Sequence, residues 1–284
     1  MVSPGFPLTC TIGKTVIGKG KLALIAGPCM AESLDMCLKV ADRLSAICRK
    51  LRIGLIFKAS YDKANRSSAS GYRGPGIETG LAWLARVREE VGVPVLSDVH
   101  DVTQVAPAAE VLDCLQVPAF LCRQTDLLVA CGRSGKCVNI KKGQFMAPAD
   151  MRLAVEKVRS TGNDQVLLTE RGTFFGYNRL VTDLRSIPQM RQFAPVVFDA
   201  THSVQEPGAL GTASGGQRQY APMLAMAAMT AGADALFIET HPDPNRAKSD
   251  AAVQIALADM PALLKQCLAV RNAVGRANVV SPKR

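Results

Sequence analysis

Short apolar runs recur along the whole chain, and each is bounded by residues that favour turns. Runs of this length that are rich in Val, Ile and Leu predict β-strands. The expected strands are residues 22–26, 53–57, 94–97, 114–117, 137–140, 165–168, 196–198 and 235–238. The runs are continuously apolar rather than alternating, which is typical of strands that helices cover on their outer side.

Apolar residues at three- and four-residue spacing predict helices between these strands. The clearest stretches are residues 34–51, 77–91, 153–158 and 223–231. Strand–helix alternation implies parallel strands, because parallel neighbours need a crossover connection. A closed (β/α)8 barrel uses about 250 residues. We therefore expect an α/β protein with one (β/α)8 TIM barrel over residues 1–284, in which residues 1–20 form a short hairpin extension that closes the bottom of the barrel.

Most of the expected strands end in a polar side chain. In a barrel these strand ends share one rim, where the active sites of this fold are built. The polar residues at the ends are Cys29, Lys58, Asp98, His100, Gln116, Lys141, Lys142, Glu170, Arg171, Asp199, His202, Glu239 and His241. One or two polar strand ends would be ordinary for a barrel. A ring of cations, carboxylates, a thiol and histidines favours a functional rim, since buried polar groups are costly without partners or ligands.

The formal net charge is +10, which suits nucleic acid, anionic lipid or small anionic ligands. The basic residues neither form a Lys/Arg block nor alternate with aromatics, so we expect no nucleic-acid partner. Cations lie singly in the rim motifs, at Lys58, Lys63, Arg66, Arg73, Arg123, Lys141 and Arg171. Arg makes two-point bonds to phosphate and carboxylate, and Lys supplies a compact charge. Small phosphorylated ligands are the better interpretation.

Cysteine usage points to a reducing compartment. The nine cysteines are odd in number and form no Cys-x-x-Cys pair, which argues against a disulfide framework or a zinc ribbon. The N-terminus shows no secretory pattern, and the longest apolar runs are too short to span a bilayer. We therefore expect a cytoplasmic protein with no membrane partner.

A thiol, an imidazole and two carboxylates form a candidate metal site, namely Cys29, His202, Glu239 and Asp250. This mixed donor set suits a divalent transition metal such as zinc, iron or manganese. Sequence spacing gives little support, because only Glu239 and Asp250 are close along the chain. Barrel closure gives more, since the first, seventh and eighth units are neighbours in space. The alternative is a buried structural cysteine and an ordinary rim histidine.

Long motifs resemble those of the metal-dependent 3-deoxy-D-manno-octulosonate 8-phosphate (Kdo 8-phosphate) synthases. The first is Ile25-Ala-Gly-Pro-Cys-Met-Ala-Glu-Ser33. The most distinctive is Phe57-Lys-Ala-Ser-Tyr-Asp-Lys-Ala-Asn-Arg-Ser-Ser68, which Tyr72-Arg-Gly-Pro-Gly76 follows. Further motifs occur in the family's order at residues 97–100, 116–126, 139–145, 170–177, 198–202 and 238–244. The resemblance extends from about residue 21 to residue 251.

The resemblance implies a transferase of Kdo and lipopolysaccharide biosynthesis. Its reaction joins phosphoenolpyruvate to D-arabinose 5-phosphate and water, and gives Kdo 8-phosphate and phosphate. It also implies one divalent metal ion per subunit and a homo-oligomer, usually a tetramer. Cys29 bears on the metal, because family members that work without metal carry Asn at this position.

The resemblance also implies roles for single residues. Those that resemble the phosphoenolpyruvate-binding cations are Lys58, Lys63, Lys141 and Arg171. Those that resemble residues holding arabinose 5-phosphate are Asn65, Arg66 and Ser67, while Arg123 matches an arginine that reaches this phosphate from a neighbouring subunit. Asp98 and Gln116 match residues that line the site. The metal ligands would be Cys29, His202, Glu239 and Asp250.

The expected chemistry begins with attack of the enolpyruvate C3 on the sugar aldehyde, after which water adds at C2. A metal ion would polarise the aldehyde, orient it or lower the pKa of a bound water. The residues expected to take part in catalysis are Lys58, Lys63, Asp98, His202 and Asp250. One departure concerns Ala251, since the family usually has Gly after the metal-binding Asp, and this leaves the conformation of the last rim loop open.

Two other functions compete. The sister enzyme 3-deoxy-D-arabino-heptulosonate 7-phosphate synthase uses erythrose 4-phosphate and shares the Gly-Pro-Cys start. It typically has Lys-Pro-Arg-Thr after the second strand, where this chain has Lys58-Ala-Ser-Tyr-Asp-Lys-Ala-Asn-Arg66. A non-catalytic basic binding protein is the second alternative. It would carry its cations on an outer surface, with no reason to place them beside Cys29 and His202.

Overall fold

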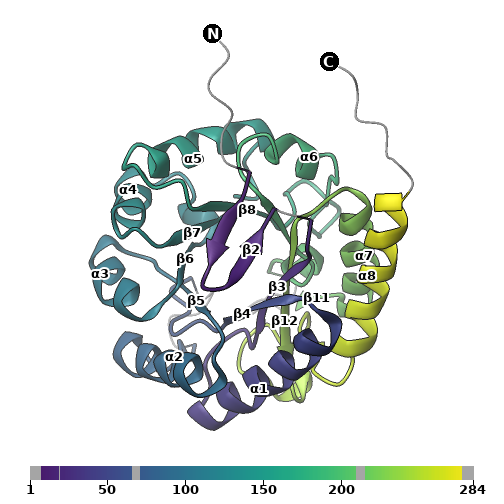
Figure 1. Ribbon diagram of the computed structural model, residues 1–284, viewed down its shortest axis with the longest axis horizontal. Coiled ribbons are helices and arrows are strands. Elements are labelled where there is room, and N and C mark those ends of the chain that lie inside the picture. Colours follow the sequence, from purple (N-terminus) through teal and green to yellow (C-terminus); the bar gives the residue numbers. More distant parts are fainter. Residues whose placement is uncertain (1–7, 19, 66–70, 209–214, 277–284) are drawn as a thin grey trace.

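Eight parallel strands close into a barrel with helices around it (Figure 1). The computed structural model describes residues 8–18, 20–65, 71–208 and 215–276. The barrel strands are β3 (Ala23–Gly27), β4 (Gly54–Lys58), β5 (Val95–Asp98), β6 (Cys114–Val117), β7 (Cys137–Lys141), β8 (Val166–Glu170), β9 (Val196–Asp199) and β12 (Ala235–His241). Strand β12 pairs with β3 on one side and β9 on the other, so the ring is complete. The predicted (β/α)8 barrel is confirmed.

The helices cover the outside of the barrel. They are α1 (Leu34–Leu51), α2 (Ile77–Val91), α3 (Val102–Val111), α4 (Thr125–Arg133), α5 (Met151–Arg159), α6 (Ser186–Met190), α7 (Ala221–Thr230) and α8 (Met260–Arg276). Helix α1 begins where the Ser33 hydroxyl accepts a hydrogen bond from the backbone N–H of Met36, which satisfies a free donor of the first turn. It ends at Arg52, whose φ of 57° lies in the left-handed region that stops a helix.

Smaller elements lie in the loops. The short strands are β10 (Gln205–Glu206), β11 (Gly215–Gly216) and β13 (Ile255–Ala256). The 3-10 turns are η1 (Ala119–Leu121), η2 (Pro148–Asp150), η3 (His202–Val204), η4 (Arg218–Tyr220) and η5 (Pro244–Arg246). Strand β13 extends the sheet beyond β12, next to the end of the chain's last rim loop.

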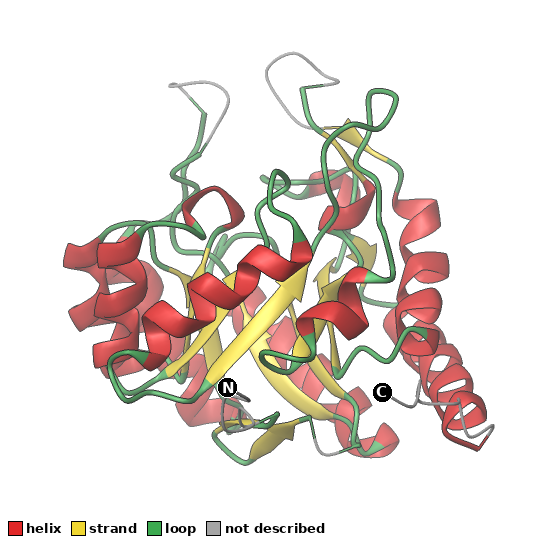
Figure 2. Cartoon of the chain, turned by 90° about the horizontal axis from the view of Figure 1, so that it is seen from above, coloured by secondary structure: helices red, strands yellow, loops and turns green. Residues whose placement is uncertain are grey.

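A hairpin of β1 (Cys10–Ile12) and β2 (Thr15–Ile17) closes the bottom of the barrel. Figure 2 shows it at the end opposite the long loops. Cys10, Ile12 and Ile17 are buried and pack into the same cluster as side chains inside the barrel. The expected hairpin is therefore confirmed.

Apolar burial occurs in two layers, one inside the barrel and one between strands and helices. Ile25, Ile56 and Leu96 belong to the inner cluster. Their neighbours Leu24 and Leu55 face the helices. Each such side chain contributes about 1.5–3 kcal/mol by leaving water, so this framework holds the strand ends in fixed positions. None of the helices in the described residues is both long and apolar enough to cross a membrane.

Candidate active site

A cavity of about 800 Å³ opens at the rim. Its walls come from the carboxyl ends of the strands and from the loops that follow them. The residues of the expected site that line it are Lys58, Lys63, Asn65, Asp98, Gln116, Lys141, Arg171, His202 and Asp250. Cys29 and Glu239 are also at this end of the barrel, with no exposed surface. Sequence reasoning thus located residues that the fold gathers around one space.

Three of the expected metal ligands form a tight group. The Sγ of Cys29 and a carboxylate oxygen of each of Glu239 and Asp250 lie within 4.8 Å of one another. The Cys29 thiol donates a hydrogen bond to Oδ2 of Asp250 at 3.2 Å. The fourth expected ligand, His202, has its Nε2 3.7 Å from Oε2 of Glu239 and 3.7 Å from Oδ2 of Asp250. All four side chains therefore converge.

One atom of this group lacks a hydrogen-bond partner. Oε2 of Glu239 is buried and accepts no hydrogen bond, whereas Oε1 accepts one from Nζ of Lys58 at 2.8 Å. A buried carboxylate oxygen without a partner is costly, and a bound cation removes that cost. Thiolate, imidazole and carboxylate are ligands that zinc and iron accept. The residues present fit a divalent transition metal.

The thiol needs such a cation to ionise. Burial raises the pKa of Cys29 well above its usual value, and the nearby carboxylates of Asp250 and Glu239 raise it further. A cation beside the sulfur reverses this balance, because metal ligation deprotonates a coordinating thiol. Without a cation, Cys29 is therefore a neutral thiol that donates its proton toward Asp250.

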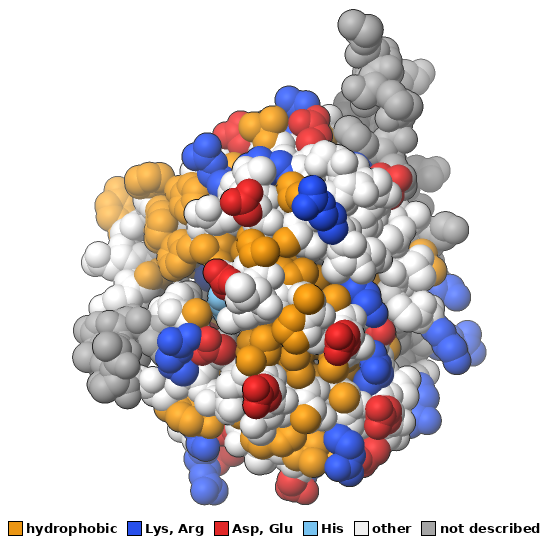
Figure 3. Space-filling view, turned by 90° about the vertical axis from the view of Figure 1, so that its left-hand side faces the viewer, with side chains coloured by type: hydrophobic (Ala, Val, Ile, Leu, Met, Phe, Trp, Pro, Cys, Tyr) orange, Lys and Arg blue, Asp and Glu red, His pale blue; other side chains and the backbone are white. Residues whose placement is uncertain are grey.

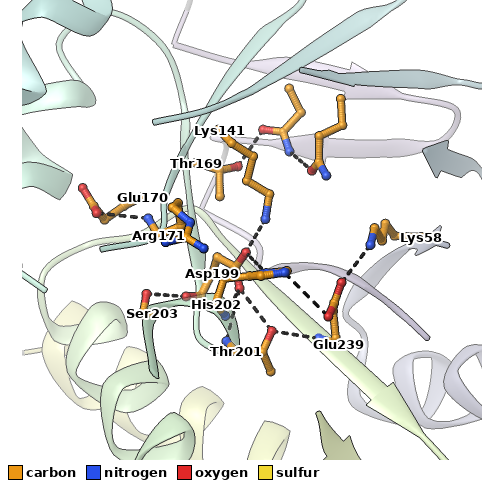
Figure 4. A network of polar contacts seen from close by, with 12 residues as sticks. Lys58, Lys141, Thr169, Glu170, Arg171, Asp199, Thr201, His202, Ser203 and Glu239 are labelled. Atoms are coloured by element: carbon orange, nitrogen blue, oxygen red, sulfur yellow. Dashed lines mark hydrogen bonds and ion pairs between the residues drawn. The ribbon is translucent and has the colours of Figure 1, made fainter. Parts of the chain in front are cut away.

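Asp199 fixes the orientation of His202. Nδ1 of the imidazole lies 2.6 Å from Oδ2 of Asp199, so Nε2 is directed toward Glu239 (Figure 4). Nε2 is also 3.7 Å from Oδ2 of Asp250. Burial alone would lower the pKa of His202, but the charges of Asp199 and Glu239 outweigh it and raise the pKa. Asp199 also pairs with Nζ of Lys141. A carboxylate that holds a histidine in this way is a common support for a metal ligand.

Two buried ion pairs bring lysines to the cavity wall. Lys58 pairs with Glu239, and Lys141 pairs with Asp199, while both ammonium groups lie over the ring of Phe237. Burial lowers the pKa of Lys141, although the charge of Asp199 opposes the shift. The paired carboxylates stabilise the buried ammonium groups. Because these groups are shielded from water, they attract an anionic ligand more strongly than they would in solvent.

Arg171 has a free donor at the cavity. Its Nη2 donates to Oε1 of Gln205 at 2.7 Å, while its buried Nη1 donates to no acceptor. The Oε1 of Gln144, also in the cavity wall, is buried and likewise unpaired. An unpaired guanidinium nitrogen that is buried beside a cavity indicates an anionic ligand, since phosphate and carboxylate oxygens satisfy it.

Three expected site residues lie elsewhere or cannot be placed. Arg66 and Ser67 are outside the described residues. Arg123 is exposed and does not line the cavity. It borders a separate hollow of about 400 Å³ beside α5, together with Lys157 and Asp150. Arg123 is therefore not part of the wall of its own chain's cavity.

The last rim loop tolerates Ala251. The left-handed residue of this loop is Asp250 itself, with φ of 46°, and Ala251 is not among the residues of positive φ. The backbone oxygen of Ala251 accepts a hydrogen bond from Nη2 of Arg218 at 2.6 Å. The strained backbone thus falls on a candidate ligand, a place where strain is often kept.

Sequence reasoning assigned no role to Asp199 and Gln205, which support His202, Lys141 and Arg171. A signal for Asp199 was present, because it ends an expected strand and lies inside one of the motifs. Gln205 carried no such signal. It follows the motif of residues 198–202, and only the fold shows that it meets Arg171.

Comparison with known proteins gives consistent matches. The sequence pattern of the DAHP synthetase I family matches residues 6–274. A protein of Citrifermentans bemidjiense named 2-dehydro-3-deoxyphosphooctonate aldolase is 58% identical over 262 residues, which are 92% of this chain and 96% of the relative. Proteins of the same name from Syntrophotalea carbinolica and Geobacter sulfurreducens are 57% and 55% identical, over 93% and 92% of this chain and 95% and 96% of their own.

Proposed function

The chain belongs to the DAHP synthetase I family, and on this premise we propose that it condenses phosphoenolpyruvate with D-arabinose 5-phosphate and water to give Kdo 8-phosphate and phosphate. The relatives' name describes a phosphorylated eight-carbon acid. Phosphoenolpyruvate has three carbons, so the other substrate must supply five. Arabinose 5-phosphate meets this requirement, whereas erythrose 4-phosphate would give a seven-carbon product.

The observation that carries the proposal is the composition of one cavity. Cations for phosphate and carboxylate line it, and a thiol, an imidazole and two carboxylates meet beside them. The non-catalytic alternative does not require this arrangement. On the face shown in Figure 3, described Lys and Arg side chains are scattered among acidic and hydrophobic ones rather than gathered in a basic patch. The proposal includes no nucleic-acid partner.

We assign phosphoenolpyruvate to the cations of the barrel wall, Lys58, Lys63, Lys141 and Arg171. The free Nη1 of Arg171 supports this assignment, because an anion in the cavity would give it the acceptor that it lacks. Lys58 and Lys141 are already held by carboxylates, so their positions are set before substrate arrives. Such preorganisation holds the enolpyruvate in attacking geometry at little further cost in entropy.

We assign arabinose 5-phosphate to the outer part of the cavity, where Asn65 lies in the wall. Arg66 and Ser67 follow it directly in the chain, and the proposal gives them the sugar phosphate. Arg123 would reach this phosphate from a neighbouring subunit of a homo-oligomer. Its exposure and its absence from the wall of its own cavity support that role.

Cys29, His202, Glu239 and Asp250 would hold one divalent ion, whose chemistry when bound is to polarise a carbonyl or to lower the pKa of a water. In the proposed reaction, C3 of phosphoenolpyruvate forms a bond to the aldehyde carbon, and the aldehyde oxygen gains a proton. The oxygen of water adds at C2, and phosphate then leaves. A ligated His202 has its Nε2 toward the metal and its Nδ1 on Asp199, so the proposal gives proton transfer to other cavity groups, Lys63 and Asp98 among them.

The test is consumption of phosphoenolpyruvate with arabinose 5-phosphate, before and after EDTA, with divalent metals added back. Activity that EDTA abolishes and metal restores is the expected result. Activity that persists after EDTA would keep the reaction and remove the metal. Activity with erythrose 4-phosphate alone would reassign the chain to the sister reaction, and none with either sugar would favour a non-catalytic protein.

A further inference from the structure

Six polar side chains form a continuous hydrogen-bonded series around half of the barrel's inner wall. In order they are Thr169, Asn139, Gln116, Asp98, Ser60 and Lys63, and we call them the polar belt. They come from β8, β7, β6, β5 and the segment after β4. Adjacent strands place Asn139 opposite Gln116, and Gln116 opposite Asp98, which brings these side chains together.

The first half of the belt joins Thr169 to Asp98 through two amides. The Thr169 hydroxyl donates to Oδ1 of Asn139 at 2.7 Å, and Nδ2 of Asn139 donates to Oε1 of Gln116 at 2.8 Å. Nε2 of Gln116 then donates to Oδ1 of Asp98 at 2.5 Å. All of these groups are buried. Figure 4 shows Thr169 beside Lys141, at the end of this series.

The second half joins Asp98 to Lys63. The Ser60 hydroxyl donates to Oδ2 of Asp98, and Nζ of Lys63 donates to Oγ of Ser60 at 3.0 Å. Ser60 has no exposed surface, so this link is shielded from water. Lys63 is a wall residue of the cavity. The belt therefore ends at a cation of the proposed phosphoenolpyruvate site.

Asp98 fixes the direction of every bond in the first half. Burial alone would raise the pKa of Asp98, but the charges of Lys58 and Lys63 outweigh it and hold the pKa well below its usual value. The carboxylate can only accept, so Gln116 must present its NH2 group there and its oxygen to Asn139. Asn139 must then present its own NH2 group to Gln116, which leaves Oδ1 in need of a donor. The Thr169 hydroxyl is that donor.

Thr169 and Asn139 lie outside the cavity wall, unlike most other members of the polar belt. Gln116, Asp98 and Lys63 line the cavity, whereas Thr169 and Asn139 have no exposed surface and take no part in its wall. They can affect a ligand only through their neighbours. A hydroxyl at position 169 is needed to complete the series of hydrogen bonds, since an apolar side chain there would leave the buried Oδ1 of Asn139 without a donor.

We propose that Thr169 and Asn139 are positioning residues for phosphoenolpyruvate. They fix the amide of Gln116 and, through Asp98 and Ser60, the ammonium group of Lys63. The identity of the ligand in this inference rests on the proposed function. Neither residue touches the ligand, so their effect is on the geometry of groups that do.

The test is binding of phosphoenolpyruvate alone to the metal-loaded enzyme, measured by calorimetry. Thr169→Val keeps the shape of the side chain and removes the hydroxyl. We expect the Kd to rise about fivefold to tenfold, which corresponds to the loss of roughly one buried hydrogen bond. Thr169→Ser restores the hydroxyl and should return the Kd to within about twofold of the wild type. In turnover, KM for phosphoenolpyruvate should rise far more than KM for the sugar.

The matched control is Thr161→Val. The Thr161 hydroxyl also donates a 2.7 Å hydrogen bond, to the backbone oxygen of Val158 at the end of α5, away from the cavity. Its loss should lower thermal stability and leave the Kd unchanged. If Thr169→Val lowers stability and leaves the Kd unchanged as well, Thr169 is merely structural and the inference fails.

A second variant keeps the inference testable if the Thr169→Val protein does not fold. Ser60→Ala breaks the other half of the belt and should also weaken phosphoenolpyruvate binding. An unchanged Kd in this variant would overturn the link between Asp98 and Lys63. The binding assay needs no second substrate. A wild type that binds phosphoenolpyruvate but does not consume it with arabinose 5-phosphate would remove the proposed reaction and leave the belt testable.

Discussion

Nζ of Lys58 lies 2.8 Å from Oε1 of Glu239, and both side chains are almost wholly shielded from solvent. Because of this pair, the two carboxylate oxygens of Glu239 have different environments. Oε1 accepts a hydrogen bond from a lysine at the cavity wall, and Oε2 has no hydrogen bond and lies 3.7 Å from Nε2 of His202. Glu239 thus connects the proposed phosphoenolpyruvate site with the candidate metal site.

Replacement of Cys29 tests the metal site directly. Cys29→Asn should weaken zinc or iron binding by roughly 100-fold or more, because even the loss of a ligand's supporting group costs about 10- to 100-fold. Metal content after dialysis, measured by mass spectrometry, checks this. Cys267→Ala is the control, since Cys267 is buried in α8, outside the metal-ligand group and the cavity wall. Full metal content in the Cys29→Asn variant would remove Cys29 from the ligands, and residual metal-free turnover would leave the reaction intact.

The barrel could be predicted from the sequence because parallel strands buried on both faces appear as apolar runs. The bounds of α1 and α2 agree with the amphipathic stretches at 34–51 and 77–91. The four expected stretches do not include α3, α4, α6 and α8. Helix α3 contains Pro107, and α6 has only five residues, too few for a helical period to appear. Length alone does not decide the outcome, since α8 spans 17 residues and was not among the expected helices.

Many residues of the candidate site could be predicted, but their pairings could not. The chemistry of strand ends and the family motifs indicated Lys58, Lys141 and Glu239. Lys58 and Glu239 are 181 residues apart in the chain, and Lys141 and Asp199 are 58 apart. Which lysine meets which carboxylate depends on the direction of side chains across a closed barrel, and no local pattern contains that information.

Loss of the Arg171 side chain should act on phosphoenolpyruvate. Arg171→Ala removes a buried guanidinium with one nitrogen free for an anion. We expect kcat/KM for phosphoenolpyruvate to fall about 100-fold, since loss of a buried charged contact costs about 3 kcal/mol. KM for arabinose 5-phosphate should change little. Arg185→Ala, at an exposed surface pair with Asp183, is the control. Equal effects on both Michaelis constants would mean that Arg171 does not belong to phosphoenolpyruvate.

Ionised Asp98 should stabilise the fold, so the free energy of unfolding should decrease when acid protonates it. Burial would raise its pKa, but Lys58, Lys63 and the Ser60 hydroxyl lower it below the usual value. The carboxylate therefore contributes stability that is fully present above about pH 4 and is lost as the pH falls further, on the order of 2–3 kcal/mol for a strongly paired carboxyl. Urea unfolding between pH 3 and pH 7 should show a smaller pH dependence for Asp98→Asn than for the wild type. Parallel curves for the two proteins would contradict the assignment.

Arg123 gives the sharpest test of assembly, because it is exposed and lies outside the cavity of its own chain. Arg123→Ala should raise KM for arabinose 5-phosphate about tenfold, the effect of roughly 1.4 kcal/mol, and leave KM for phosphoenolpyruvate unchanged. Oligomers that contain two different variants would show whether Arg123 acts in its own subunit's cavity or in a neighbour's. We would mix Arg123→Ala subunits with Arg171→Ala subunits in one oligomer. An Arg123→Ala subunit keeps Arg171 in its own cavity, and a neighbouring Arg171→Ala subunit can supply the missing Arg123. Activity above the sum of the two parent variants would show that Arg123 acts between subunits. Activity equal to that sum would place its effect within its own chain.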